Sequence, residues 1–196
     1  MNLPNKLTIL RIVLSPLFLL LAVWEFPFHY AAALIVFIVA ALTDMMDGKI
    51  ARSRGLITNL GKFLDPLADK MLTTAAFLVF MVTGQMNVWA LMIVLTREFM
   101  VTSVRLLAAK DGTVIAASIW GKIKTVAQFI AIIYTLLALE ISSWQTGLLA
   151  GLNLPSAVFT VPLVVGQVLI WISVALTALS GAEYVWGNRH YFTGEK

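Results

Sequence analysis

The chain has 196 residues, of which 60% are hydrophobic and only 12% are charged, and its formal net charge is +4. Soluble domains contain about 25% charged and about 45–50% apolar residues, so this composition excludes an ordinary water-soluble domain. The absence of cysteine excludes disulfides, thiolate metal sites and cysteine nucleophiles. The basic residues flank apolar runs instead of forming a solvated face, which indicates membrane topology and not nucleic-acid binding. The sequence therefore predicts one integral membrane domain over residues 1–196.

Several apolar stretches approach or exceed the roughly 20 residues that cross a bilayer core. We predict helical spans at 7–24, 30–52, 60–82, 88–109, 120–139 and 162–186. Lys6 and Arg11 precede the apolar run from Ile12 to Trp24, as in a signal peptide, but LAVWEF is a poor cleavage site, which favours an uncleaved span. The connection 140–161 is long enough for an interfacial or re-entrant piece. The predicted fold is all-α, with six transmembrane helices.

The lysines and arginines follow the predicted topology. All fourteen lie in or next to the N-terminus, 49–70, 97–124 and the tail from Arg189. The connections near 25–29, 83–87 and 140–161 contain none. Because positively charged connections stay in the cytoplasm, we expect a cell-membrane protein with both termini and a polar active-site cavity facing the cytoplasm.

Four aspartates stand beside long apolar runs. They belong to the pattern D-x2-D-G-x2-A-R-x8-G-x3-D-x3-D, which is filled by Asp44, Asp47, Gly48, Ala51, Arg52, Gly61, Asp65 and Asp69. A carboxylate at membrane depth costs about 2.5–3.5 kcal/mol, so four together favour a neutralising divalent cation. On two antiparallel helices they can converge and supply oxygen ligands for two Mg²⁺ or Mn²⁺ ions. The alternative is an ion network with Lys49, Arg52, Lys62 and Lys70.

The residue types in this pattern suit phosphoryl transfer. Glycines leave bare backbone that a pyrophosphate or a planar group can approach closely. Two metals about 3.5–4 Å apart are a standard arrangement for in-line displacement at phosphorus, and a carboxylate can take the proton of an attacking hydroxyl. No serine, histidine or cysteine is placed as a covalent nucleophile, so direct attack by an alcohol is the simplest interpretation. Pro66, beside Asp65, can kink the third span.

The pattern resembles the signature of the CDP-alcohol phosphotransferases, with no departure in spacing or identity. The resemblance implies six transmembrane helices, transfer of a phosphatidyl group from CDP-diacylglycerol to an alcohol with release of CMP, and a homodimer. It implies that Asp44, Asp47 and Asp65 are metal ligands. It further implies that Asp69 is the general base and a ligand to the second metal.

The same resemblance implies a cytidine nucleotide site formed by Gly48, Ala51, Arg52 and Gly61. Asn5 and Thr8 lie three residues apart on a polar stripe that opens the first span and also contains Pro4 and Arg11. They can reach the nucleotide or its diphosphate. Helix capping and headgroup anchoring are equally plausible roles for these two residues.

Three further stretches narrow the acceptor alcohol: NLPNKLTILRIVLSP, GKFLDPLADK and TREFMVTSVRLLAAKDG…GKIKT. They resemble the bacterial branch of the family that attaches glycerol 3-phosphate to CDP-diacylglycerol. Candidate ligands of the acceptor phosphate are Arg97, Arg105, Lys122 and Lys124. A cation inside an apolar helix needs a partner, which a dianionic phosphate would supply. In the alternative, Arg97 pairs with Glu98 or an aspartate and the lysines anchor helix ends.

Two other functions stay open at this point. One is a sibling phosphatidyltransferase that uses inositol phosphate, serine or phosphatidylglycerol as its acceptor. The other is a divalent-cation channel or transporter, since acids within membrane spans also mark ion pathways. The aspartates cluster at one membrane face and leave the outer halves of the spans apolar, which disfavours a conduction path.

Overall fold

The computed structural model describes residues 3–54, 59–110, 118–145, 148–149, 151–152 and 154–189. Within the helices, the side chains of 3–4, 45–54, 59–63, 65 and 110 lie outside the described part. The described chain forms six helices: α1 (Leu3–Val23), α2 (His29–Arg54), α3 (Asn59–Val82), α4 (Val88–Lys110), α5 (Ile119–Ser143) and α6 (Ala157–Gly187). All six predicted spans are therefore confirmed as helices.

Helix α1 begins four residues before the predicted span, and the connection between the last two helices is shorter than predicted at both ends. Helix α5 continues to Ser143, and α6 begins at Ala157 instead of at residue 162. The described residues between these helices form turns, one of which is closed by a hydrogen bond from Leu149 N to Trp144 O at 2.9 Å. No re-entrant helix is found among the described residues of this connection. Helix α3 is continuous through Pro66.

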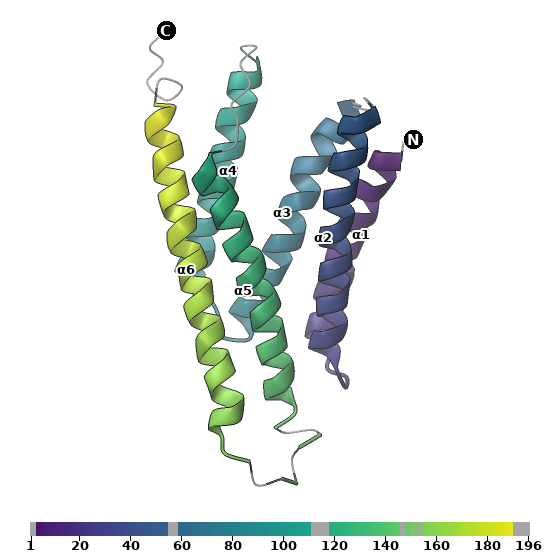
Figure 1. The fold of residues 1–196 in the computed structure, drawn as a ribbon, viewed down its shortest axis with the longest axis vertical. Coiled ribbons are helices and arrows are strands. Elements are labelled where there is room, and N and C mark those ends of the chain that lie inside the picture. The colour runs from purple at the N-terminus through teal and green to yellow at the C-terminus, as the bar shows by residue number, and fades with distance from the viewer. Residues whose placement is uncertain are drawn as a thin grey trace.

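The helices form two groups of three that diverge toward one end of the molecule (Figure 1). Helix α1 packs on α2 and α3, while α6 packs on α5 and α4. Contacts between α2 and α5 join the groups, where the Phe37 ring lies 5.6 Å from that of Phe129 and 5.9 Å from that of Phe18. Gly166 lets α6 approach α5 closely, since a Cβ there would lie 3.0 Å from Thr135 Oγ1.

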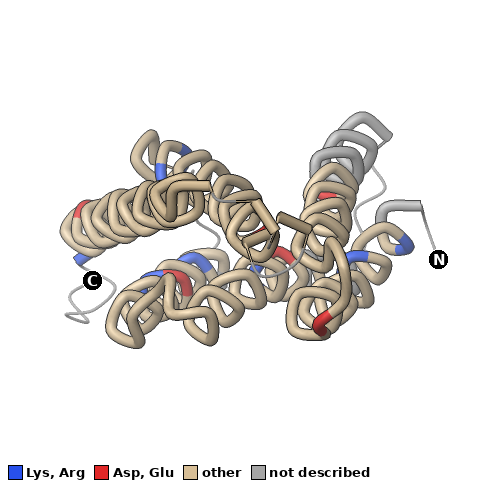
Figure 2. Tube along the Cα trace, turned by 90° about the horizontal axis from the view of Figure 1, so that it is seen from below, with Lys and Arg blue, Asp and Glu red and all other residues tan. Residues whose placement is uncertain are grey.

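The outward faces of the bundle are apolar. Val82, Trp89 and Trp186 are 74%, 75% and 77% exposed, which suits contact with lipid. Three helices of the described chain are long and apolar enough to cross a membrane: Asn5–Val23, Ile119–Ser143 and Ala157–Gly187. A shorter apolar stretch covers His29–Asp44. Figure 2 shows the charged residues as isolated patches on a largely uncharged bundle. The fold is that of an all-helical membrane protein.

Candidate active site

Asp44 is fixed by a partner on the neighbouring helix. Its Oδ1 lies 2.5 Å from Nη1 of Arg11, so the ion pair joins α2 to α1. The Arg11 side chain is 1% exposed, whereas that of Asp44 is 45% exposed. Ser15 also belongs to this polar stripe of α1, and its Oγ donates to Arg11 O at 2.9 Å. Arg11 thus fixes the orientation of the Asp44 carboxylate from within the bundle, while the other side of the carboxylate is open to a ligand.

Asp69 lies where the two helix groups face each other. Its side chain is exposed on α3, and its charge is close enough to interact with those of Asp44 on α2 and of Glu98 and Lys124 on α4 and α5. The next residue, Lys70, donates a hydrogen bond to Thr102 Oγ1 on α4. The polar part of α3 therefore connects the aspartates to a second polar cluster.

The second cluster is built around Glu98. Its Oε1 accepts a hydrogen bond from Arg97 Nη1 at 3.2 Å and another from Lys124 Nζ. The pairing of Arg97 with Glu98 that the sequence left open is therefore confirmed. Arg97 also donates from Nη2 to Ser180 Oγ on α6 at 2.6 Å, and its side chain is 9% exposed. Two buried cations from different helices thus meet on one carboxylate.

A buried polar stripe on α6 supports this cluster, and sequence reasoning missed it. Gln128 accepts from Lys124 Nζ at 3.3 Å and donates from Nε2 to Thr177 Oγ1 at 3.2 Å. Ser173, Thr177 and Ser180 are all fully buried. Their spacing of four and three residues on an apolar helix is a signal that could have identified them, since such a stripe marks one helix face.

The other predicted acceptor residues lie farther along the same elements. Arg105 is exposed on α4, with its guanidinium carbon 5.8 Å from the ring centroid of Tyr184 on α6. Lys122 is exposed at the start of α5. The structure therefore brings Arg97 and Lys124 together at Glu98, places Arg105 against α6, and leaves Lys122 at the surface.

Several predicted residues have side chains outside the described part of the chain. These are Asp47, Gly48, Ala51, Arg52, Gly61 and Asp65. Their backbones lie on α2 and α3, the two helices that carry Asp44 and Asp69. Asn5 and Thr8 are described: they are 5% and 1% exposed on α1, the helix that carries Arg11. A polar cavity at this end stays a prediction.

The described donors fit a hard divalent cation. Asp44 and Asp69 offer carboxylate oxygens, interact electrostatically across two helices, and keep exposed surface that can accept a ligand. Among the described side chains there is no group of three or more potential metal ligands. The sequence pattern supplies two further carboxylates, Asp47 and Asp65, whose side chains are not among those described.

Comparison with known proteins decides the family. The family model described as CDP-alcohol phosphatidyltransferase matches residues 1–179. The chain belongs to the CDP-alcohol phosphatidyltransferase family. Membership makes it an enzyme and rejects the channel or transporter alternative. The family match also agrees with the resemblance that was inferred from the aspartate pattern.

Curated members of the phosphatidyltransferase family match over most of the chain. The CDP-diacylglycerol–glycerol-3-phosphate 3-phosphatidyltransferase of Bacillus subtilis is 38% identical over 195 residues, which cover 93% of each chain. The protein of the same name from Rickettsia bellii is 31% identical and covers 97% of each chain. A probable phosphatidylglycerophosphate synthase of Mycobacterium tuberculosis is 42% identical over 67% of this chain and 64% of its own length.

Proposed function

We propose that this phosphatidyltransferase moves the phosphatidyl group of CDP-diacylglycerol to sn-glycerol 3-phosphate, giving phosphatidylglycerol phosphate and CMP. The observation that carries the proposal is the 38% identity over 93% of both chains to a Bacillus subtilis enzyme named for this reaction. The buried cluster is compatible with a phosphorylated acceptor, because Arg97 and Lys124 together carry one more charge than the Glu98 carboxylate that pairs with them.

The reaction is a displacement at phosphorus. The acceptor oxygen attacks the phosphorus that carries the diacylglycerol, the bond from that phosphorus to the CMP oxygen breaks, and the hydroxyl proton passes to Asp69. The exposure of Asp69 supports this role, since a base must reach the hydroxyl directly or through one water. Asp69 lies between Asp44 and the Glu98 cluster, a position that suits a base acting between the bound CDP-diacylglycerol and the acceptor alcohol.

Asp44, Asp47, Asp65 and Asp69 would hold two divalent cations, Mg²⁺ or Mn²⁺. When bound, such ions neutralise charge on the diphosphate and on the leaving phosphate. Arg11 orients Asp44 for ligation from α1. Gly48, Ala51, Arg52 and Gly61, together with Asn5 and Thr8, would bind the cytidine diphosphate part of the donor.

We propose that Arg97, Arg105, Lys122 and Lys124 bind the acceptor phosphate. Glu98 holds Arg97 and Lys124 close together and offsets part of their charge. A dianionic phosphate carries more negative charge than the Glu98 carboxylate and can accept charge-assisted hydrogen bonds from the same donors. The guanidinium of Arg105 can reorient from the Tyr184 ring because its side chain is exposed.

We also propose that the aspartate end faces the cytoplasm, in the cell membrane. Helix α1 begins and α6 ends at the same end of the bundle (Figure 1). Every lysine and arginine falls in or next to segments assigned to that side, which supports the orientation. The homodimer implied by the family resemblance stays a prediction.

A panel of acceptors tests the function. Purified protein is incubated with CDP-diacylglycerol, Mg²⁺ and one of glycerol 3-phosphate, glycerol, serine, inositol phosphate or phosphatidylglycerol, and CMP release is measured. We expect glycerol 3-phosphate to be the strong substrate and excess chelator to stop its turnover. Preference for another alcohol would reject the acceptor while leaving the family assignment intact. Full turnover in chelator would reject the metal proposal.

A further inference from the structure

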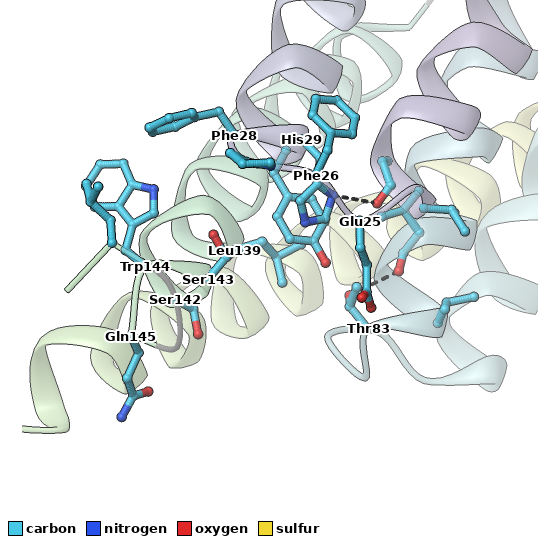
Figure 3. Close-up of a pocket in the computed structure, with 17 residues that line it drawn as sticks. Glu25, Phe26, Phe28, His29, Thr83, Leu139, Ser142, Ser143, Trp144 and Gln145 are labelled. Atoms are coloured by element: carbon cyan, nitrogen blue, oxygen red, sulfur yellow. Dashed lines mark hydrogen bonds between the residues drawn. The ribbon is translucent and has the colours of Figure 1, made fainter. Parts of the chain in front are cut away.

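A large cavity lies at the end of the bundle opposite the aspartates, and the proposed reaction does not use it. It has a volume of about 980 Å³ and is formed by the α1–α2 connection, the end of α3, and the end of α5 with the turn that follows. Figure 3 shows Glu25 extending from the α1–α2 connection toward the end of α3, where Thr83 lies. The cavity therefore opens at the other membrane surface.

The polar groups of this cavity suit a cation. Glu25 is exposed on its lining and makes no hydrogen bond or ion pair among the described residues. No lysine or arginine belongs to the described lining, and the sequence places none in 25–29, 83–87 or 140–161. An anionic group would thus meet the Glu25 carboxylate, and the His29 ring is the one basic side chain among the described lining residues. Charge complementarity favours a positively charged group here.

Aromatic rings line the same cavity as Glu25. The His29 ring lies 3.9 Å from that of Tyr30 and 6.0 Å from that of Phe26. Phe28 meets Trp144 edge to face at 6.4 Å. Phe28 has a φ of 65°, a left-handed conformation that costs energy in a non-glycine residue and often marks a functional site. Aromatic faces beside a carboxylate are a recognised setting for an ammonium group.

A second hollow continues the cavity along the lipid-facing surface. A groove of about 490 Å³ shares Val23, Val79 and Val82 with the cavity and continues along α1 as far as Pro16. Its described lining is entirely apolar. At 1.5 Å per residue, this stretch of α1 is roughly 10 Å long. A polar compartment that leads into an apolar groove on the lipid-facing surface matches a headgroup joined to an acyl chain.

We propose that this cavity and groove bind a membrane lipid whose headgroup carries an ammonium. The ammonium pairs with Glu25 in the aromatic-lined cavity, and one acyl chain lies in the groove between α1 and α3. The site belongs to the leaflet opposite the proposed active site, so it is separate from the site for CDP-diacylglycerol. The inference rests on membrane insertion and does not depend on which acceptor the enzyme uses.

Native mass spectrometry of the detergent-solubilised full chain tests the headgroup. Phosphatidylethanolamine and phosphatidylglycerol with the same acyl chains are added separately, and the bound fraction is compared. We expect the native protein to retain the ethanolamine lipid preferentially. Glu25→Gln should weaken binding of that lipid by up to about fivefold, from loss of an exposed ion pair. Glu183→Gln, an exposed carboxylate on α6, is the matched control.

A second pair of variants tests the groove without touching the carboxylate. Val82→Trp fills the hollow shared by cavity and groove, and Val82 is 74% exposed, so the fold should tolerate it. We expect weaker binding of the ethanolamine lipid, while Val126→Trp, at a 59% exposed position on α5, should bind normally. Thermal unfolding should be unchanged in all four variants.

Three results would overturn the proposal. The first is equal retention of the two lipids by the native protein. The second is an unchanged preference in both Glu25→Gln and Val82→Trp. The third is competition by soluble phosphoethanolamine at the same concentration as the lipid, which would make the cavity a site for a small soluble amine. CMP release should be the same in Glu25→Gln as in the native enzyme.

Discussion

Arg11 and Asp44 form an ion pair between α1 and α2, with 2.5 Å between Nη1 and Oδ1. The arginine is buried and the carboxylate is half exposed, so the arginine acts as a support and the aspartate as the side chain available to a ligand. A carboxylate that must bind a metal is more effective when a neighbouring group fixes its orientation. The pair therefore links the first helix, which carries none of the four aspartates, to the proposed metal site.

The first prediction tests this support. Arg11→Lys keeps the positive charge but loses the planar guanidinium group, whose fixed geometry orients Asp44. The Mg²⁺ concentration for half-maximal CMP release should rise roughly 10- to 100-fold, as when other outer partners of metal ligands are changed. Lys6→Ala, at an exposed position on the same helix, should leave the metal dependence unchanged. An unaltered Mg²⁺ requirement in Arg11→Lys would limit Arg11 to a structural role.

The second prediction concerns the proton. Asp69→Asn removes the carboxylate that we assign as general base, and kcat should fall by at least about 10²–10⁴-fold. Because the amide is close in size and the position is exposed, thermal unfolding should change little. If Asp69 is also a ligand, the metal requirement will rise as well. Turnover close to that of the native enzyme would move the base role to another residue.

The third prediction uses the close packing of α6 against Arg97. A Cβ on Gly181 would lie 2.9 Å from Arg97 Cγ, so Gly181→Ala forces the Arg97 side chain or α6 to shift, and we expect the contact of Arg97 with Ser180 to weaken. The KM for glycerol 3-phosphate should rise about tenfold, the loss expected for one charge-assisted hydrogen bond, while the KM for CDP-diacylglycerol stays the same.

The matched control for Gly181→Ala is Gly187→Ala, since a Cβ at Gly187 meets open space. Alanine favours a helix over glycine by about 1 kcal/mol, so neither change should weaken α6 intrinsically. An equal rise in both KM values in Gly181→Ala would assign Arg97 to the fold or to the donor site.

The fourth prediction separates Arg105 from the rest of the cluster. Arg105→Ala should raise the KM for glycerol 3-phosphate roughly ten- to hundredfold and reduce discrimination against unphosphorylated glycerol. Arg105→Lys keeps the positive charge but loses the bidentate guanidinium, so its KM should lie between those of the native enzyme and of Arg105→Ala. Steady-state kinetics with both alcohols measures the effect. If both variants discriminate as well as the native enzyme, Arg105 does not bind the acceptor phosphate.

The fifth prediction concerns sidedness. Gly187 and Gly151 lie at opposite ends of the bundle, and a side chain at either would meet open space. Because the chain has no cysteine, single variants Gly187→Cys and Gly151→Cys give clean labelling with an impermeant thiol reagent. The Gly151→Cys variant should react in intact cells, and the Gly187→Cys variant only after the membrane is opened. The reverse pattern would invert the proposed topology.

The sequence by itself determined the helices and the family. Helical spans could be predicted because each depends on a local run of apolar residues long enough for the bilayer. The aspartate pattern could be identified because its residues are close in the chain, and helical spacing alone places Asp44 with Asp47 and Asp65 with Asp69. These features need no knowledge of how the helices pack.

Only the tertiary structure decided which distant residues meet. Arg11 pairs with Asp44, Glu98 bridges Arg97 and Lys124, and Gln128 contacts Thr177 across 49 positions of sequence. At the other end, Glu140 accepts a hydrogen bond from Ala31 N, 109 positions away. Such contacts depend on the rotation and crossing of helices, which are set by side-chain packing over the whole bundle and not by local spacing.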